Sequence, residues 1–241
     1  MRTKVFVLAG LMAFAIAVSS FAQTKSAAYP EMYGDNAGST ILIMPPINTT
    51  NEVEAKEYFY YTMNTELSSR GWYVYPPVLA LRTLQEESAN DSELFVDADI
   101  SKFGEIFGAD YLMFTTIEQW YKSTVAKTLQ VIATYNLRST KTGKTVFSRK
   151  CSYTYSLANV DSAASNLASM NTGNAIIDLI GAVSALGVMA GTAVATAKTG
   201  TMDVARYCNL YAFQDIPYGP LQGHQGEDAE DDAKPYYIMQ N

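Results

Sequence analysis

The side chains that most often carry enzyme chemistry are scarce in this sequence. His224 is the only histidine, and it follows Gly223 at the start of an acidic run. General acid–base catalysis most often uses histidine, and a Ser-His-Asp triad needs that histidine to be held rigidly. His224 is therefore interpreted as a surface residue. We expect no catalytic residues and predict that the protein is not an enzyme.

The sequence indicates no cofactor and no metal site. Cys151, Cys208 and His224 lack the spacing of zinc ligands. The Gly-Lys-Thr at 143–145 lacks the upstream glycine of a phosphate-binding loop. The carboxylates of 97–101 and 227–232 do not follow the calcium-loop pattern, and helix capping and solvation explain them more simply.

Asp110 is the one acid in a setting that looks fixed, because it lies between Gly108 and an apolar run that begins at Tyr111. One interpretation is a binding site at the edge of a sheet. The favoured interpretation is a turn aspartate that accepts backbone N–H groups. Trp72 and Trp120 are expected to be core or rim aromatics, with stacking against a sugar as the alternative.

Two interpretations of the cysteines stay open. In an oxidising compartment Cys151 and Cys208 would form a disulfide. Otherwise both are buried thiols, since an unpaired cysteine packs as a small hydrophobe. The sequence gives no distance between them.

A series of strands and helices must position these residues. Ile41–Met44 is a continuous apolar run, which is typical of a strand covered on both faces, and Pro45-Pro46 ends it because proline donates no N–H. Asn51 and Glu54 have capping-box spacing, which predicts a helix that ends at Gly71. Next come a strand at 72–75, which Pro76-Pro77 ends, a helix at 78–84, and a helix from 99 to 108.

The later strands have a different pattern. Residues 111–120 begin as an apolar run, and 129–137 alternate apolar with polar residues except at Ile132. A turn containing Thr142-Gly143 then joins 129–137 to a strand at 146–155, which predicts an antiparallel hairpin. The predicted fold class is α/β, with a mixed sheet at 39–158. It has a parallel β-α-β start plus an antiparallel hairpin and is flanked by helices.

Residues 160–198 are predicted to be a long helical segment rich in small residues, within a region at 159–222 that packs back on the domain. Gly187, Gly191 and Ala195 recur every four residues, and such a row lets backbones approach closely. Packing on the domain or on a second subunit is favoured, with a break near Gly173 and a homo-oligomer as the result. Contact of 175–197 with a membrane surface or a partner, and a membrane span, are the alternatives.

The two ends of the chain are expected to lie outside the fold. Residues 1–22 have the basic start, apolar run and small residues of a secretory signal peptide, which predicts a periplasmic protein that begins near Gln23. A lipid anchor is not expected, because no cysteine follows the apolar run. Residues 23–38 are predicted to be a linker, and 223–241 a solvated acidic tail. The net charge of −7 argues against binding to nucleic acid.

Several segments resemble a family of bacterial lipoproteins of unknown function that is often encoded beside curli-channel-like proteins. The segments are IMPPIN (43–48), SRGWYVYP (69–76), EIFGADYLMFTTIEQW (105–120) and PYGP (217–220). The resemblance implies a fold like the amino-terminal domain of TolB and the penicillin-binding-protein activator lipoproteins. It also implies an envelope accessory role with no catalytic residues to carry over. Most members have the lipobox cysteine, which this chain lacks.

Two hypotheses for function follow. The first is a non-catalytic periplasmic accessory protein of the cell envelope that acts through protein–protein contacts. Its partners would be envelope proteins, a curli-channel-like outer-membrane protein among them. The second is a binding domain for a small ligand or cell-wall fragment, in a cleft near the Pro-Pro corners. The candidate interaction residues are Gly187, Gly191, Ala195, Trp72, Trp120 and Asp110.

Overall fold

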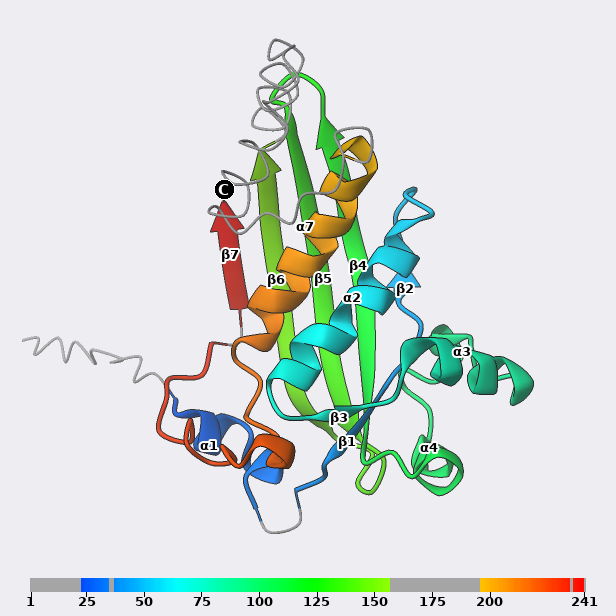
Figure 1. Cartoon of the computed structure of the whole chain (residues 1–241), viewed down its shortest axis with the longest axis vertical. Coiled ribbons are helices and arrows are strands. Elements are labelled where there is room, and N and C mark those ends of the chain that lie inside the picture. Colours follow the sequence, from blue (N-terminus) through cyan, green and yellow to red (C-terminus); the bar gives the residue numbers. More distant parts are fainter. Residues whose placement is uncertain (1–22, 35–36, 157–195, 235, 241) are drawn as a thin grey trace, which may run out of the picture.

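The computed structural model describes residues 23–34, 37–156, 196–234 and 236–240. They form a seven-stranded mixed sheet flanked by helices (Figure 1). The strands lie in the order β3-β1-β4-β5-β6-β7, and β2 pairs with β4. β1 is parallel to β3 and β4, whereas β5 is antiparallel to both of its neighbours, β4 and β6. The predicted α/β class with a mixed sheet is confirmed.

The strands are β1 (Thr40–Ile43), β2 (Ile47–Asn48), β3 (Tyr73–Val74), β4 (Tyr111–Ser123), β5 (Thr128–Ser139), β6 (Thr145–Ser156) and β7 (Tyr236–Gln240). The helices are α1 (Lys25–Ala28), α2 (Ala55–Ser69), α3 (Pro77–Glu86), α4 (Ser101–Phe107) and α7 (Thr196–Phe213), with 3-10 turns at Pro30–Met32, Ser92–Leu94 and Pro220–Gln222. Among the described helices, none combines the length and the apolar character needed to cross a membrane.

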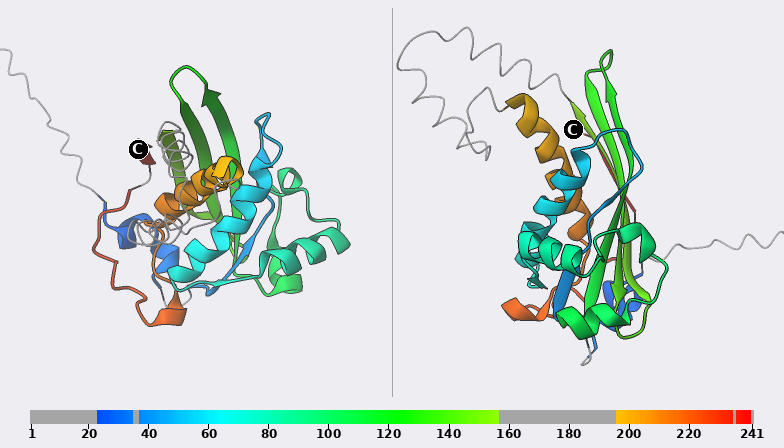
Figure 2. Two further views of the ribbon diagram at one scale, coloured as in Figure 1. Left: turned by 45° about the horizontal axis from the view of Figure 1, so that its top comes forward. Right: turned by 90° about the vertical axis from the view of Figure 1, so that its right-hand side faces the viewer.

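Both faces of β1 are covered, which explains its continuous apolar run. Ile41 and Ile43 belong to a core that α2 and α7 share with one face of the sheet. Leu42 and Met44 point to the other face, where α3 and α4 form a smaller core. Figure 2 shows α2 and α7 lying together on one side of the sheet. The sheet therefore has helices on both faces at its β1 end.

The hairpin strands are covered mainly on one face. Along β5 the buried and half-buried side chains alternate without a break, and Ile132 lies on the half-buried side. Leu129, Val131, Ala133, Tyr135 and Leu137 all reach the core under α2 and α7. The alternation of apolar and polar residues at 129–137 thus arises because only one face of this strand packs against the core.

The helix after β1 starts later than the sequence predicts. Its first residue is Ala55, and Glu54 caps it without a side-chain hydrogen bond, so the expected capping box of Asn51 and Glu54 is not formed. Val53, which precedes the helix, is 83% exposed. The reason lies upstream: the Asn48 side chain binds the backbone of Thr50 and Glu52, which holds 48–52 as a turn.

The prediction of a linker at 23–38 is wrong for the part that the structure describes. Tyr29 and Met32 are buried in the main core. Backbone hydrogen bonds also pair residues 23–26 with residues 229–233, through Lys25 N–H to Asp231 C=O at 2.8 Å and Ala233 N–H to Gln23 C=O at 2.7 Å. We call this pairing the terminal seam.

The prediction of a solvated tail at 223–241 is also wrong in part. Asp228 is only 3% exposed, and its carboxylate lies 3.0 Å from the Lys25 ammonium and 3.8 Å from the Arg70 guanidinium. β7 then joins the sheet in parallel with β6. Asp228 is therefore a buried structural residue within an acidic run, and the strand β7 follows that run.

A second buried ion pair lies beside the terminal seam. Arg149 on β6 is 1% exposed, and its guanidinium lies 2.9 Å from the Asp215 carboxylate. The same carboxylate accepts hydrogen bonds from the Tyr29 hydroxyl and the Lys234 N–H. This cluster joins the first described segment, the sheet and the chain after α7.

Candidate functional site

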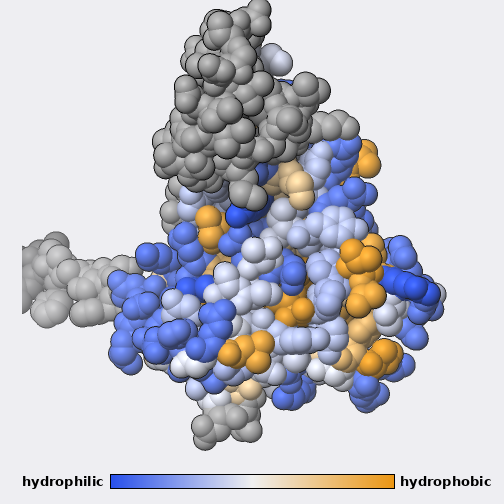
Figure 3. Space-filling view, in the orientation of Figure 1, coloured by the Kyte–Doolittle hydropathy of each residue, from blue (hydrophilic) through white to orange (hydrophobic). Residues whose placement is uncertain are grey.

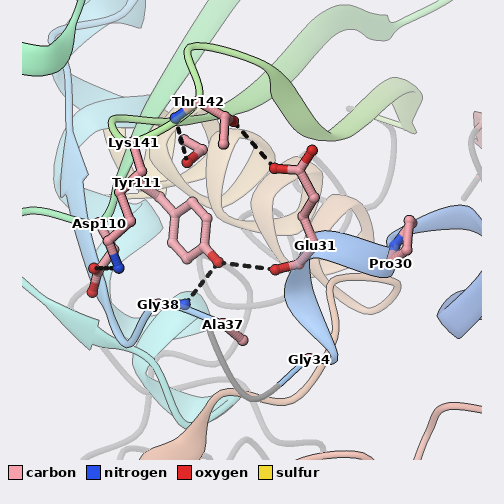
Figure 4. A pocket seen from close by; sticks show the side chains of 10 residues that line it. Pro30, Glu31, Gly34, Ala37, Gly38, Asp110, Tyr111, Lys141 and Thr142 are labelled. Carbon is pink, nitrogen blue, oxygen red and sulfur yellow. Dashed lines mark hydrogen bonds and ion pairs between the residues drawn. The ribbon is translucent and has the colours of Figure 1, made fainter.

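A hollow of about 340 Å³ opens at the amino ends of β1 and β4 (Figure 4). It lies at the opposite end of β1 from the Pro45-Pro46 corner, where the sequence suggested a cleft. Its walls come from three regions, namely the first described segment, the β1 and β4 starts, and the β5–β6 turn. The lining residues are Pro30, Glu31, Gly34, Ala37, Gly38, Asp110, Tyr111, Ser139, Lys141 and Thr142.

Asp110 forms one wall of the hollow and stabilises the chain around it. Its carboxylate accepts hydrogen bonds from the N–H groups of Ser39 at 2.8 Å and Thr40 at 3.2 Å, and it pairs with Lys141 at 2.9 Å. Burial would raise the pKa of Asp110, but these donors and the Lys141 charge lower it overall. The favoured interpretation, a turn aspartate that accepts backbone N–H groups, is confirmed.

Tyr111 and Glu31 form the opposite side. The Tyr111 hydroxyl accepts the Gly38 N–H at 2.9 Å and donates to the Glu31 carbonyl at 3.4 Å, while burial raises the pKa of Tyr111. The Glu31 carboxylate accepts from the Thr142 hydroxyl and pairs with Lys144 at 3.4 Å. The charged groups of the hollow thus satisfy one another.

This geometry does not resemble a catalytic site. A nucleophile with an adjacent base is the usual signature of covalent catalysis, and the charged groups at this hollow are engaged in holding three segments together. In the described part of the chain, no group of three or more His, Cys, Asp or Glu side chains could hold a metal ion.

The two tryptophans lie in different places. Trp72 is 1% exposed, donates its indole N–H to the Pro217 carbonyl at 2.9 Å and packs edge-on against Tyr111. Its buried ring excludes sugar stacking. Trp120 is half-buried on β4, with its ring centroid 6.3 Å from that of Tyr58 and 6.5 Å from that of Phe59, as a rim aromatic.

The other residues named from the sequence do not join this hollow. His224 is exposed, and its ring lies 2.9 Å from Glu227. Gly187, Gly191 and Ala195, together with the expected break near Gly173, fall outside the described residues. Cys151 and Cys208 are both buried free thiols.

A surface that the sequence analysis missed lies on α3. Ala80 and Leu84 of this helix are buried, whereas Val78 is 68% and Leu79 64% exposed. Figure 3 shows hydrophobic surface over the side of the molecule that carries α3 and α4, and Ile106 of α4 is 54% exposed. The signal in the sequence was Val78-Leu79-Ala80-Leu81, four apolar residues in a row, which places apolar groups on more than one side of a helix.

An exposed tyrosine lies at the edge of the sheet on this side of the molecule. Tyr73 on β3 is 46% exposed and packs edge-on against Tyr75, whose ring does the same with Phe107 of α4. β3 is the last strand on this side of the described sheet. We call the exposed side chains of Tyr73, Val78, Leu79 and Ile106 the α3 surface.

The sequence as a whole matches a known family. The model of the GNA1162-like lipoprotein family matches residues 29–204. The chain belongs to this family. The match spans the smaller core, most of the larger core, the hollow and the α3 surface, and it confirms the resemblance to a bacterial lipoprotein family.

Three solved structures are similar to this chain at low sequence identity. Lipoprotein GNA1162 from Neisseria meningitidis is 22% identical, with 55% of this chain and 99% of that chain covered and a TM-score of 0.46. A PelC dodecamer from Paraburkholderia phytofirmans is 14% identical, covering 73% and 86%, with a TM-score of 0.42. The LpoB C-terminal domain from Salmonella enterica is 15% identical, covering 54% and 94%, with a TM-score of 0.36. No curated protein matches the chain.

Proposed function

We propose that this chain is a non-catalytic accessory protein of the bacterial cell envelope that acts through protein–protein contacts, including contacts with copies of itself. Membership of a lipoprotein family supports the envelope role. The signal-peptide pattern of residues 1–22 supports export to the periplasm, and the absence of a cysteine after its apolar run supports a protein without a lipid anchor.

The α3 surface is the observation that carries the proposal. Surface helices normally turn their polar side to solvent, and exposed apolar patches mark interaction sites. On α3, Val78 and Leu79 are more exposed than the two leucines that follow them. The adjoining β3 lies at an edge of the described sheet, so a second chain would find apolar side chains beside a strand edge.

The alternative, a binding domain for a small ligand or cell-wall fragment, gains less support. The hollow beside Asp110 and Tyr111 has charged groups that pair with one another. It also lies at the amino ends of β1 and β4, whereas the sequence predicted a cleft near the Pro-Pro corners, Pro45-Pro46 after β1 and Pro76-Pro77 after β3.

A charge placed on the α3 surface tests the proposal. We expect light scattering to show that the purified protein is oligomeric. Leu79→Asp should raise the protein concentration needed for association by at least tenfold, because an aspartate would be desolvated in the contact. Val125→Asp is the matched control, since Val125 is 96% exposed in the turn between β4 and β5, away from the α3 surface. Self-association would be excluded by a wild-type protein that stays monomeric at high concentration.

The small-residue row supplies a second variant. Gly191→Leu would push closely packed backbones apart, so we expect a shift toward monomer if 187–195 contributes to self-association. In cells, a photocrosslinking amino acid at position 79 should capture a second copy or a specific envelope protein that is not captured from position 125. Equal capture from both positions would contradict a role for the α3 surface.

A further inference from the structure

The two cysteines of the protein lie on different elements of the main core. Cys151 is on β6 and Cys208 is on α7, and neither side chain is exposed. They are 57 residues apart in the sequence, so only the packing of α7 against β6 brings them together.

Contacts on both sides of the cysteines fix this packing. Arg149 and Tyr153 flank Cys151 on the same face of β6, because side chains two residues apart in a strand point the same way. The Arg149 guanidinium donates to the Tyr211 carbonyl at 3.4 Å, and the Tyr153 ring lies 6.0 Å from the Tyr211 ring. Between these contacts, the thiols of Cys151 and Cys208 lie next to each other in the core.

The two cysteines lie in an apolar environment. Both thiols belong to the apolar core, beside Ala133 and Tyr135. Burial raises the pKa of Cys208, while the neighbouring Cys208 thiol lowers the pKa of Cys151. The attacking group in thiol–disulfide exchange is a thiolate.

We propose that Cys151 and Cys208 form an intramolecular disulfide when the chain folds in an oxidising compartment. This goes beyond the proposed function and takes from it only the export that would bring the chain to such a compartment. The oxidant is a disulfide, either of glutathione or of a thiol–disulfide oxidoreductase. The thiolate of one cysteine attacks one of its sulfurs and releases a thiolate; the thiolate of the other cysteine then attacks the protein sulfur of the mixed disulfide and releases the second. Two protein thiols are oxidised and one disulfide is reduced to two thiols, with the two protons passing to solvent or to the released thiolates.

The bond would form during folding, because both sulfurs are inaccessible afterwards. It would tie α7 to the sheet and close a loop that contains the whole of residues 157–195. For a loop of this length in a domain of this size, we expect the oxidised protein to melt about 10 °C above the reduced protein.

Trypsin gives a direct test, because its sites separate the two cysteines. Cuts after Lys150 and Lys198 release a peptide that begins with Cys151, and the cut after Arg206 releases a second peptide that holds Cys208. The full chain is unfolded, reduced and refolded in a mixture of oxidised and reduced glutathione. Free thiols are then blocked with N-ethylmaleimide in denaturant before digestion and mass spectrometry.

The expected result is that the two peptides are joined and separate only after reduction. Maleimide on both cysteines, a glutathione adduct, or a disulfide between two chains would overturn the proposal. The melting temperature gives a second readout: reductant should lower it for the wild-type protein and leave Cys151→Ala/Cys208→Ala unchanged. An equal response of both proteins would count against the disulfide.

The same digest, applied to protein taken from cells without reduction, separates this inference from the proposed function. An amino-terminal peptide that starts near Gln23 reports export independently of the cysteines. Free thiols in a chain that starts there would overturn the disulfide and leave the proposed location standing. An uncleaved amino terminus would count against the location, while the refolding result would still decide the disulfide.

Discussion

The carboxylate of Asp110 connects the starts of β1 and β4. It accepts two backbone N–H groups from Ser39 and Thr40, the Thr40 hydroxyl at 2.9 Å and the Lys141 ammonium. The backbone pairing of the sheet alone would leave these donors without this acceptor. The contribution of Asp110 is therefore to stability, and it depends on its charge.

Asp110→Asn should lower the free energy of unfolding by about 1–3 kcal/mol at pH 7, because one acceptor oxygen and the ion pair are lost. The pKa of Asp110 is lower in the folded state than in the unfolded chain. Its ionised form therefore contributes stability above about pH 4, and this contribution is lost as the pH falls through the folded pKa. Urea unfolding at pH 7 and pH 3 should show the gap between wild type and variant narrowing in acid. The exposed Glu57→Gln is the control, and a gap that does not change with pH would contradict this account.

At the level of single residues, the sequence predicted local roles and missed distant ones. Gly108 and the apolar run from Tyr111 were enough to suggest a turn aspartate at position 110. Asp228 looked like any other acid in its run, because Lys25, which neutralises it, is 203 residues away. The exposure of Leu79 could not be predicted for a similar reason, since it depends on which side of α3 packs against the sheet.

Two glycines bring separate elements into backbone contact. Gly71, which ends α2 with a φ of +85°, and Gly219, just before the turn at Pro220–Gln222, lie against each other. The Gly219 N–H donates to the Arg70 carbonyl at 2.8 Å, and the Leu221 N–H donates to the Gly71 carbonyl at 3.0 Å. The chain after α7 is thus fixed to the corner between α2 and β3.

Gly219→Ala should destabilise the protein by about 1–3 kcal/mol through overpacking. A Cβ at this position would lie 2.3 Å from the Gly71 carbonyl oxygen, which is backbone and cannot rotate away. Gly34→Ala is the matched control, because a Cβ there meets nothing within 4 Å. Thermal unfolding of both variants measures the difference; equal melting temperatures would show that the corner adjusts freely.

Elements were predictable where their pattern is local. The alternation at 129–137 and the proline pairs after 43 and 75 define strands without any knowledge of their partners. β7 was missed because it follows a charged run, and its partner β6 lies 86 residues earlier in the chain, with Lys150 opposite Tyr236. The later start of α2 reflects the short strand β2 and its turn, which use residues that would otherwise cap the helix.

For the whole molecule, the residue at which signal-peptide cleavage is expected is held by the fold. Gln23 already accepts a hydrogen bond from Ala233 in the terminal seam. Mass spectrometry of the protein from cells should find a chain that starts at or near Gln23 without an acyl group. A lipid-modified or uncleaved amino terminus would refute this prediction.

The terminal seam also decides how the molecule would respond to tension. If the first described residues were held and the chain were pulled at Lys234, the load would fall on the backbone pairing of 23–26 with 229–233 and on the bond between Lys25 and Asp228. Lys234 is also bonded to the Arg149 guanidinium of β6 and to the Asp215 carboxylate, so part of the load would pass through these two side chains. We expect the seam and these side-chain bonds to part first, because the strands of the sheet are held by many more backbone hydrogen bonds. The chain would then lengthen at the seam while the cores on both faces of the sheet stay intact.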